Sequence, residues 1–383
     1  MEVRKLYYED CHQKTFCATV LDCRETDKGW RVTLDATAFY PEGGGQACDL
    51  GTLNDAAVLD VREIDSQIVH LCDRELCPGT QVTGSIDWQR RFDLMQQHTG
   101  EHIVSGIIHR LYGYHNVGFH MGADVVTIDF DGPIPPEALV QIELEANTAI
   151  WQNLPVRCWY PSPEELPTVG YRTKRELPWP VRVVEVPGYD KCACCGVHVV
   201  ATGEIGIIKL LGCVKFHQGV RIEMVCGGRA LTYLSQVYEQ NRQVSQAFSA
   251  KVLETGAAAR RMNEMLAEEK FRTAGLQKQV FAATAEDYAG KGNVLHFAPG
   301  LSASALRELA ETIAARCGGI AAVFSGEDGT PYNLCLLGNN AKALGTDACK
   351  ALDGRGGGKP DAFQGSVKAT KAQIEIFFRT QLG

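Results

Sequence analysis

Two segments that lie far apart in this chain each carry a pair of side chains that bind metal ions. In HTGEH, His98 and His102 are four residues apart. On a helix this spacing puts both imidazoles on one face, about 6 Å apart, which is close enough to share one ion. In DKCACCGVH, Cys194 precedes His198 by four residues in a Gly-containing loop. The four side chains form an N₃S donor set suited to zinc, so the sequence predicts a fold in which both segments meet at one ion.

Both segments allow a second interpretation. HTGEH also fits H-x-x-E-H, the pattern of zinc peptidases in which the glutamate is the base. Glu101 is therefore a candidate catalytic base, beside the interpretation that it is a solvated helix residue. In the second segment, Cys192 and Cys195 form C-x-x-C, so a pair that includes Cys195 is an alternative to Cys194 with His198. We favour Cys194.

Composition excludes several classes of protein. With 45% apolar and 22% charged residues, the 383-residue chain is typical of a soluble globular protein of two to three domains. No stretch approaches the roughly 20 apolar residues that span a bilayer, and the start, MEVRKLYYEDCHQ, has no apolar signal region. We expect a cytoplasmic protein without a membrane partner, in which the 15 cysteines stay reduced. The net charge of −8 argues against a general nucleic-acid coat but allows a local basic face.

The pattern of apolar and polar residues changes along the chain. Over residues 1–86, short runs such as WRVTLD and AAVLDVREI alternate apolar with polar residues, which predicts a β-barrel domain that contains a Gly-rich motif. Residues 87–230 combine a helical apolar face with strand-like runs such as VVTIDF and VRIEMV, which predicts an α+β domain that holds the zinc site.

The C-terminal part has two further patterns of apolar and polar residues. Over residues 231–285, apolar residues recur at three- or four-residue steps, which predicts a coiled-coil-like helical stalk or hairpin, interrupted at Gly256. Residues 286–383 mix strands with an amphipathic helix from Ala303 to Cys317, which predicts a C-terminal α/β domain. The expected fold class of the whole chain is α+β.

Four motifs occur in one order: YPEGGGQACDLG, HTGEH, CCGVH and TGEIGIIK. In this combination they resemble the editing domain of alanyl-tRNA synthetase and its freestanding relatives, the alanyl-tRNA editing proteins. Nearer the end, GGGKPDAFQG resembles the C-terminal domain of that synthetase, and the helical segment before it resembles that domain's coiled linker. Nothing in the chain resembles the aminoacylation or anticodon-recognition modules. The resemblance, which covers nearly the whole chain, implies a trans-acting editor of the long, two-part form.

The resemblance implies a reaction. A pocket shaped for alanine cannot fully exclude glycine or serine, because apolar discrimination of this kind is worth only about 1 to 3 kcal/mol. A second, hydrolytic site would cleave the ester of Ser-tRNA(Ala) or Gly-tRNA(Ala), and this ester is already activated, so no ATP is needed. The implied cofactor is Zn²⁺, the implied partner is mischarged tRNA(Ala), and the C-terminal third implies a homodimer.

Further candidate residues lie in and beyond these motifs. Candidates for substrate binding are Gly43, Gly44, Gly45, Gln46, Phe119, His120, Thr202 and Gly203. Candidates for tRNA binding are Arg90, Arg91, Arg172, Lys174, Arg175, Gly356, Gly357, Gly358 and Lys359. Each set also has a plainer interpretation. The substrate-binding candidates could be a turn of the barrel, a core or surface histidine and loop-forming residues. The tRNA-binding candidates could be solvated surface charges and a tight turn.

The chain departs from the family pattern at one position. Val197 stands where the family's Cys/His box usually has threonine, which removes a hydroxyl beside the metal and bears on fine specificity rather than on ligation. The resemblance also weakens the peptidase interpretation, because such enzymes take their third ligand from a distant acidic residue. The nearest rival of another class is a non-catalytic tRNA-binding module with a structural zinc ion.

Overall fold

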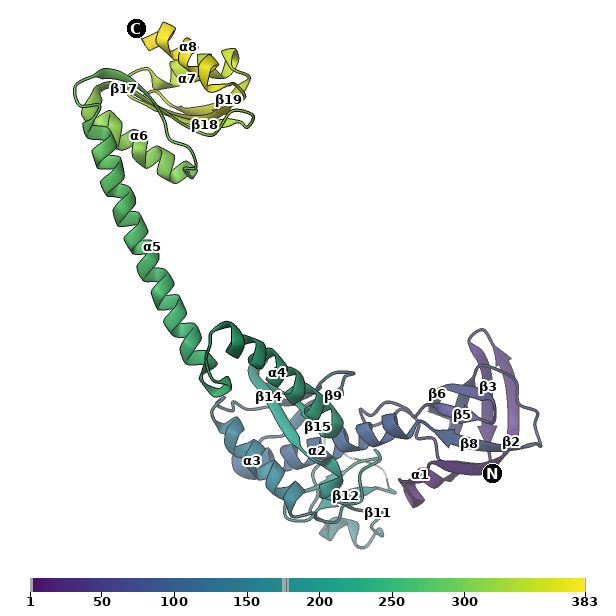
Figure 1. Ribbon diagram of the computed structural model, residues 1–383. Coiled ribbons are helices and arrows are strands. Elements are labelled where there is room, and N and C mark those ends of the chain that lie inside the picture. The colour runs from purple at the N-terminus through teal and green to yellow at the C-terminus, as the bar shows by residue number, and fades with distance from the viewer. Residues whose placement is uncertain (1–2, 174–176, 178, 383) are drawn as a thin grey trace. The chain divides into compact units, whose positions relative to one another are not determined.

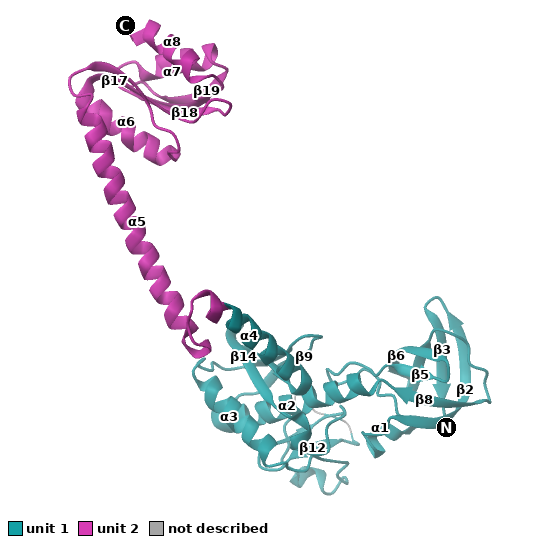
Figure 2. Ribbon diagram, viewed as in Figure 1, with its two compact units in different colours: residues 1–243 teal, residues 244–383 magenta. Residues whose placement is uncertain are grey.

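A computed structural model describes residues 3–173, 177 and 179–382 of the protein. The chain divides into two compact units, residues 1–243 and 244–383 (Figure 2). Both units combine helices with sheets, which confirms the α+β class expected from the sequence.

Unit 1 begins with a six-stranded sheet that closes on itself in the order β2-β3-β7-β6-β5-β8 (Figure 1). Its strands are β2 Thr15–Thr26, β3 Gly29–Leu34, β5 Gly51–Leu53, β6 Ala56–Ile64, β7 Gln67–Cys72 and β8 Gln81–Ile86. The short elements beside it are β1 Arg4–Lys5, α1 Leu6–Glu9 and β4 Ala36–Thr37, and β1 pairs with β4 in parallel. Alternate residues point inward, so every second residue of β8 is buried.

His70 is fully buried inside this closed sheet. Its Nε2 lies 2.9 Å from Thr37 Oγ1, and its Nδ1 lies 3.1 Å from the carbonyl oxygen of Val32. Burial lowers the pKa of His70 to about 4, so the imidazole is neutral in the folded protein near neutral pH.

The helix α2, Trp88–Tyr112, follows the closed sheet and carries the HTGEH segment. It begins at the N-cap Asp87, whose side chain accepts a hydrogen bond from the Arg90 N–H, and it ends at Gly113 in the left-handed conformation. All residues from Leu94 to Ile108 are buried. A helix buried on all sides can hold polar residues only where partners satisfy them, and this explains the network described below.

A four-stranded antiparallel sheet, β14-β15-β10-β9, packs with α2 and α3 around the largest core of unit 1. These elements are β9 Asn116–Met121, β10 Val126–Phe130, α3 Ala138–Trp151, β14 Ile208–Phe216 and β15 Gly219–Cys226. A three-stranded sheet consists of β11 Arg157–Trp159, β12 Val183–Val186 and β13 Asp190–Ala193, with the short helices η1 Leu166–Thr168 and η2 Thr202–Ile205 in the connections. The Cys/His box follows β13 directly.

The helical segment expected over 231–285 consists of two helices, α4 Gly227–Ala247 and α5 Thr255–Glu286, with η3 Val252–Glu254 before the second. The expected interruption at Gly256 was wrong. The break falls at Phe248–Lys251, where Ser249 has a φ of 50° and the Ser245 hydroxyl donates to the Ala250 carbonyl oxygen. Gly256 lies in the first turn of α5, where glycine is tolerated.

Unit 2 contains a mixed five-stranded sheet in the order β16-β17-β18-β20-β19. Only β16 and β17 pair in parallel. The elements are β16 Gly292–Phe297, α6 Ala303–Cys317, β17 Gly318–Ser325, β18 Tyr332–Leu337, α7 Ala341–Ala351, β19 Gly354–Lys359, β20 Ala362–Val367 and α8 Lys371–Leu382. The expected helix Ala303–Cys317 is confirmed at both ends, because Ser302 caps it and Gly318 follows in the left-handed conformation.

The Gly-rich segment near the end forms a strand rather than the tight turn considered from the sequence. Gly356 and Gly358 pair with β20 so closely that a Cβ at either position would lie within 2.6 Å of its backbone or of the Phe363 ring. Glycine at these positions is therefore explained by close pairing at the sheet edge.

Candidate metal centre and pocket

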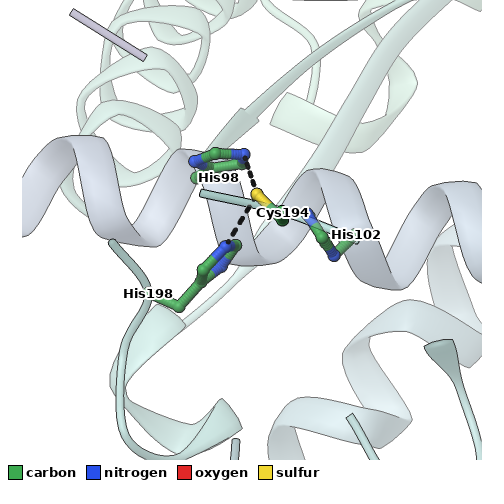
Figure 3. Close-up of side chains that lie close together, drawn as sticks. All are labelled: His98, His102, Cys194 and His198. Atoms are coloured by element: carbon green, nitrogen blue, oxygen red, sulfur yellow. Dashed lines mark hydrogen bonds between the residues drawn. The ribbon is translucent and has the colours of Figure 1, made fainter. Parts of the chain in front are cut away.

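The two predicted ligand segments meet in unit 1 (Figure 3). His98 and His102 project from α2, whereas Cys194 and His198 come from the loop after β13, and the four ligand atoms lie within 4.8 Å of one another. The Cys194 Sγ lies 3.4 Å from His98 Nε2 and 3.4 Å from His198 Nε2. At metal–ligand distances of about 2.1 Å for nitrogen and 2.3 Å for sulfur, neighbouring donors of a tetrahedral ion lie about 3.6 Å apart. The cluster therefore fits a tetrahedral transition-metal ion.

A different partner holds the far nitrogen of each histidine. His98 Nδ1 lies 2.8 Å from Gln46 Oε1, His102 Nδ1 lies 3.0 Å from Asp190 Oδ2, and His198 Nδ1 lies 3.1 Å from Thr99 Oγ1. An N–H at each Nδ1 donates to these oxygens, which leaves each Nε2 lone pair for an ion. Such partners fix the tautomer and the ring orientation of metal-binding histidines.

The electrostatics of the cluster favour a thiolate among imidazoles. Burial opposes ionisation of Cys194, but the charges of His98 and His102 outweigh it and hold the pKa of the thiol well below its usual value. Burial also disfavours a charged His102, yet the Cys194 thiolate and the Asp190 carboxylate raise its pKa well above normal. Burial lowers the pKa of His198 to about 3, so this imidazole is neutral. A metal ion binds a thiolate and neutral imidazoles, so its binding would displace the proton that the raised pKa keeps on His102.

The structure brings Cys194, and not Cys195, to the histidines. The Cys195 side chain instead faces the Tyr40 hydroxyl, 3.9 Å from its Sγ, while the Cys195 carbonyl oxygen accepts a hydrogen bond from Tyr8. A Cβ on Gly196 would lie 2.1 Å from the His98 ring, so this position of the box requires glycine.

A cavity of about 1580 Å³ opens beside the cluster. Its lining includes three of the four ligands, together with Gly44, Gly45, Glu101, Asn116, Phe119, Tyr171, Arg172 and Asp190. The Phe119 ring stacks on His98, with ring centroids 5.4 Å apart. The cavity therefore gives a molecule access to the metal cluster from one side.

The Gly-rich segment reaches this cavity as a tight turn. Gly43 and Gln46 exchange backbone hydrogen bonds, and Gly44 and Gly45 have φ values of 59° and 83°, which favour glycine. A Cβ on Gly45 would also lie 2.5 Å from the Phe119 ring. Gly44 and Gly45 line the cavity, Gln46 supports His98, and Gly43 closes the turn.

The other predicted substrate-binding residues lie elsewhere. His120 pairs with Thr127 on the face of β9 opposite to Phe119, and it is exposed. The Thr202 hydroxyl is buried, where it donates to the Ala149 carbonyl oxygen, and the Gly203 N–H donates to Asn153 Oδ1. Thr202 and Gly203 thus join η2 to the end of α3, and neither they nor His120 are among the described residues that line the cavity.

The structure places the residues of the predicted basic clusters in different environments. Arg91 is fully buried in an ion pair with Asp49 and donates to the Ala38 carbonyl oxygen, so its assignment as a tRNA contact was wrong. Its guanidinium instead ties α2 to the segment between β4 and β5. Arg172 lines the cavity, with its Nε 2.7 Å from Asp190 Oδ1.

The remaining predicted tRNA contacts have other positions. Arg90 donates to the Cys48 carbonyl oxygen and remains part-exposed. Lys174 and Arg175 lie outside the described residues. Gly356, Gly357, Gly358 and Lys359 lie in β19 at the sheet edge of unit 2.

Sequence reasoning missed the residues that orient the ligands. Asp190 and Thr99 lie inside the two quoted motifs, but short polar residues next to ligands carry no signal that separates them from loop and helix formers. Glu101 is 5% exposed, so the interpretation that it is a solvated helix residue was wrong. Its Oε1 accepts hydrogen bonds from Ser105 and Asn116.

Comparisons with known proteins identify the family. The model of the threonyl and alanyl tRNA synthetase second additional domain matches residues 181–223, which include the Cys/His box, and that of class II (A) tRNA synthetases matches residues 5–90. The alanyl-tRNA editing protein Aarsd1 of Mus musculus is 30% identical, over 96% of this chain and 94% of its own length. The chain belongs to the alanyl-tRNA editing proteins.

Relatives of two other kinds match as well. The alanyl-tRNA editing protein AlaX-L of Pyrococcus horikoshii is 34% identical over 61% of each chain. The alanine–tRNA ligase of Thermofilum pendens is 32% identical over 97% of this chain but only 43% of its own length. Membership of the editing family leaves no support for a zinc peptidase. Within the described residues, no helix is both long and apolar enough to span a membrane.

Proposed function

We propose that this protein is a zinc-dependent hydrolase that removes serine or glycine from mischarged tRNA(Ala). The observation that carries the proposal is the N₃S cluster at the wall of a large cavity, in a chain whose relatives are named alanyl-tRNA editing proteins. The scissile bond is the ester between the amino acid and the 3′-terminal ribose. Its hydrolysis corrects errors that an alanine pocket cannot avoid by binding alone.

His98, His102, Cys194 and His198 would hold the ion. When bound, zinc supplies positive charge beside the ester. Four protein ligands fill a tetrahedral site, so we assign most of the rate to positioning of the ester and an attacking water by the chain itself. Gly44 and Gly45 allow close approach of the tRNA end to the cavity, and the Phe119 ring bounds the space for the amino acid.

Val197 bears on this specificity only indirectly. Its side chain is 1% exposed, it is not among the described residues that line the cavity, and its N–H donates to Gln46 Oε1. A threonine hydroxyl at this position would be buried in the core of unit 1 and would not line the cavity. We therefore expect Val197 to leave both serine and glycine as substrates.

Because the chain carries a net charge of −8, the rest of the tRNA needs a local basic surface to bind to. We propose that Arg90 and Arg172 contact the acceptor end and that the edge around β19, with Arg355 and Lys359, contacts the body of the tRNA. The exposed apolar residues of α5, which include Met262, Met265, Leu266 and Phe271, would be covered in a homodimer.

Deacylation of radiolabelled Ser-tRNA(Ala) and Gly-tRNA(Ala) tests the proposal, with Ala-tRNA(Ala) as the control that should persist. A second candidate, a non-catalytic tRNA-binding module, is favoured by the filled ligand set, which is typical of structural zinc. Binding of the mischarged tRNA without release of the amino acid would establish that second candidate and reject the first.

A further inference from the structure

A second polar cluster lies in the same cavity as the metal ligands. Glu101 and Asn116 both line the cavity, and both are more than nine-tenths buried, with 5% and 6% of their surface exposed. Asn116 Nδ2 donates to Glu101 Oε1 over 2.5 Å, and the Ser105 hydroxyl donates to the same oxygen. Glu101 lies directly before the ligand His102 on α2, so this cluster is next to the metal centre.

Two hydrogen bonds fix the orientation of the Asn116 amide. Its NH₂ group donates to Glu101 Oε1 and, over 3.2 Å, to the Ser105 hydroxyl. The Asn116 Oδ1 therefore points away from Glu101, and it is buried without a hydrogen-bond partner. A buried acceptor without a donor costs about 1 to 3 kcal/mol, and such groups call for a specific explanation.

The Glu101 carboxyl group can also accept more hydrogen bonds than it does. Its hydrogen bonds are both made by Oε1, and within the described residues Oε2 accepts none and the carboxylate has no ion pair. The nearby Arg172 has a charge interaction with Glu101, but its Nε donates to Asp190.

A β-bulge brings Asn116 to this position. In the pairing of β9 with β10, Phe119 lies opposite Ile128, but the register shifts so that Asn116 lies opposite Phe130, and Val117 is the extra residue. Ile128 and Phe130 point to the core face, so Asn116 and Phe119 share that face although they are three residues apart. Bulges of this kind often turn a side chain toward a functional site.

We propose that Glu101 and Asn116 bind the free α-amino group of the aminoacyl ester. The group that binds here must donate to two acceptors, Asn116 Oδ1 and the Glu101 carboxyl group. An amino group has two or three N–H donors and a positive charge when protonated, whereas the serine hydroxyl has a single donor. The proposal rests on the proposed function and adds a boundary to it: the site accepts aminoacyl-tRNA and rejects tRNA whose amino acid is N-acylated, as in peptidyl-tRNA.

The test measures binding to tRNA(Ala) that carries serine through a non-hydrolysable 3′-amide, with the α-amino group free or acetylated. We expect the wild-type protein to bind the free form at least about tenfold more tightly than the acetylated form. Asn116→Ala should lose most of this preference by weakening the free form only. Asn147→Ala is the matched control, because Asn147 is a buried asparagine that contacts the Ile208 backbone and does not line the cavity.

The outcomes separate the two proposals. Equal binding of both forms by the wild-type protein, or an unchanged preference in Asn116→Ala, would overturn the recognition role even if Ser-tRNA(Ala) is deacylated. In parallel, Glu101→Gln should lower deacylation of Ser-tRNA(Ala) chiefly through a raised KM, with zinc content unchanged. A fall in kcat of about 10² to 10⁴ at unchanged KM would instead make Glu101 a general base and contradict the proposal.

Discussion

Gln46→Met should weaken metal binding although Gln46 touches no ion. Gln46 Oε1 lies 2.8 Å from His98 Nδ1 and also accepts the Val197 N–H over 3.1 Å. Methionine keeps the length and approximate volume of the side chain but cannot replace this acceptor. The His98 ring would then lose the contact that fixes its tautomer, and the box would lose the contact that holds the Val197 backbone.

The expected magnitude follows from comparable outer partners. Loss of such a partner usually costs about 10- to 100-fold in metal affinity, which equals about 1.4 to 2.7 kcal/mol. The unpaired Val197 N–H adds about 1 to 3 kcal/mol of lost stability, because it is buried against the same oxygen. The two effects are separable, since the first appears as a dissociation constant and the second as an unfolding free energy.

Competition for zinc against a chromophoric chelator at neutral pH measures the first effect, and urea unfolding measures the second. Gln97→Met is the control, because Gln97 is equally buried, precedes His98 on α2 and, within the described residues, forms side-chain hydrogen bonds only with Cys226 and Asp93. We expect the control to lose stability without a change in zinc affinity. If both variants bound zinc as tightly as the wild-type protein, the assigned role of Gln46 would be refuted.

Three further predictions address the ligands, the closed sheet and the C-terminal unit. Elemental analysis should find about one zinc ion per chain in the wild-type protein and in Cys195→Ala and Cys11→Ala, but a lowered content in Cys194→Ala; loss only in the Cys195 variant would show that the wrong thiol was chosen. The pKa of His70 is about 4 in the folded protein, below the unfolded value of about 6.5, so protonation favours the unfolded chain. Between pH 6.5 and 4 the wild-type protein should therefore lose about 3 kcal/mol of stability more than His70→Gln. Parallel curves of unfolding free energy against pH for the two proteins would contradict this. Residues 1–243 alone should bind zinc and cleave Ser-tRNA(Ala), with weaker tRNA affinity and a shallower salt dependence than the full chain; identical binding at several salt concentrations would exclude a tRNA-anchoring role for the second unit.

The ligand set was predictable because it depends on local spacing. His98 and His102 needed only one helical turn, and Cys194 and His198 needed only a tight loop. The helix Ala303–Cys317 was predictable for a similar reason, since its cap residues lie next to it in the sequence. These features are determined by a few consecutive residues.

Features that depend on distant contacts were not predictable. In the sequence, Arg91 has the pattern of a surface charge. Only the fold shows that it is buried in an ion pair with Asp49. Asn116 reaches the cavity because of a bulge, which shifts the strand register by one residue and leaves no periodic signal. The strand formed by the glycines of β19 was not predicted, because close pairing with β20 is also a long-range contact; the sequence suggested only a tRNA contact or a tight turn.

The central claim is that the metal cluster and its cavity form a deacylation site. Its most direct test compares the release of serine from Ser-tRNA(Ala) by the zinc-loaded wild-type protein and by Cys194→Ala, at protein concentrations that saturate tRNA binding in both. We predict rapid release by the wild-type protein, near-background release by the variant, and similar tRNA affinity for both. Release at the wild-type rate by the zinc-free variant, or no release by the zinc-loaded wild-type protein that binds this tRNA, would contradict the account.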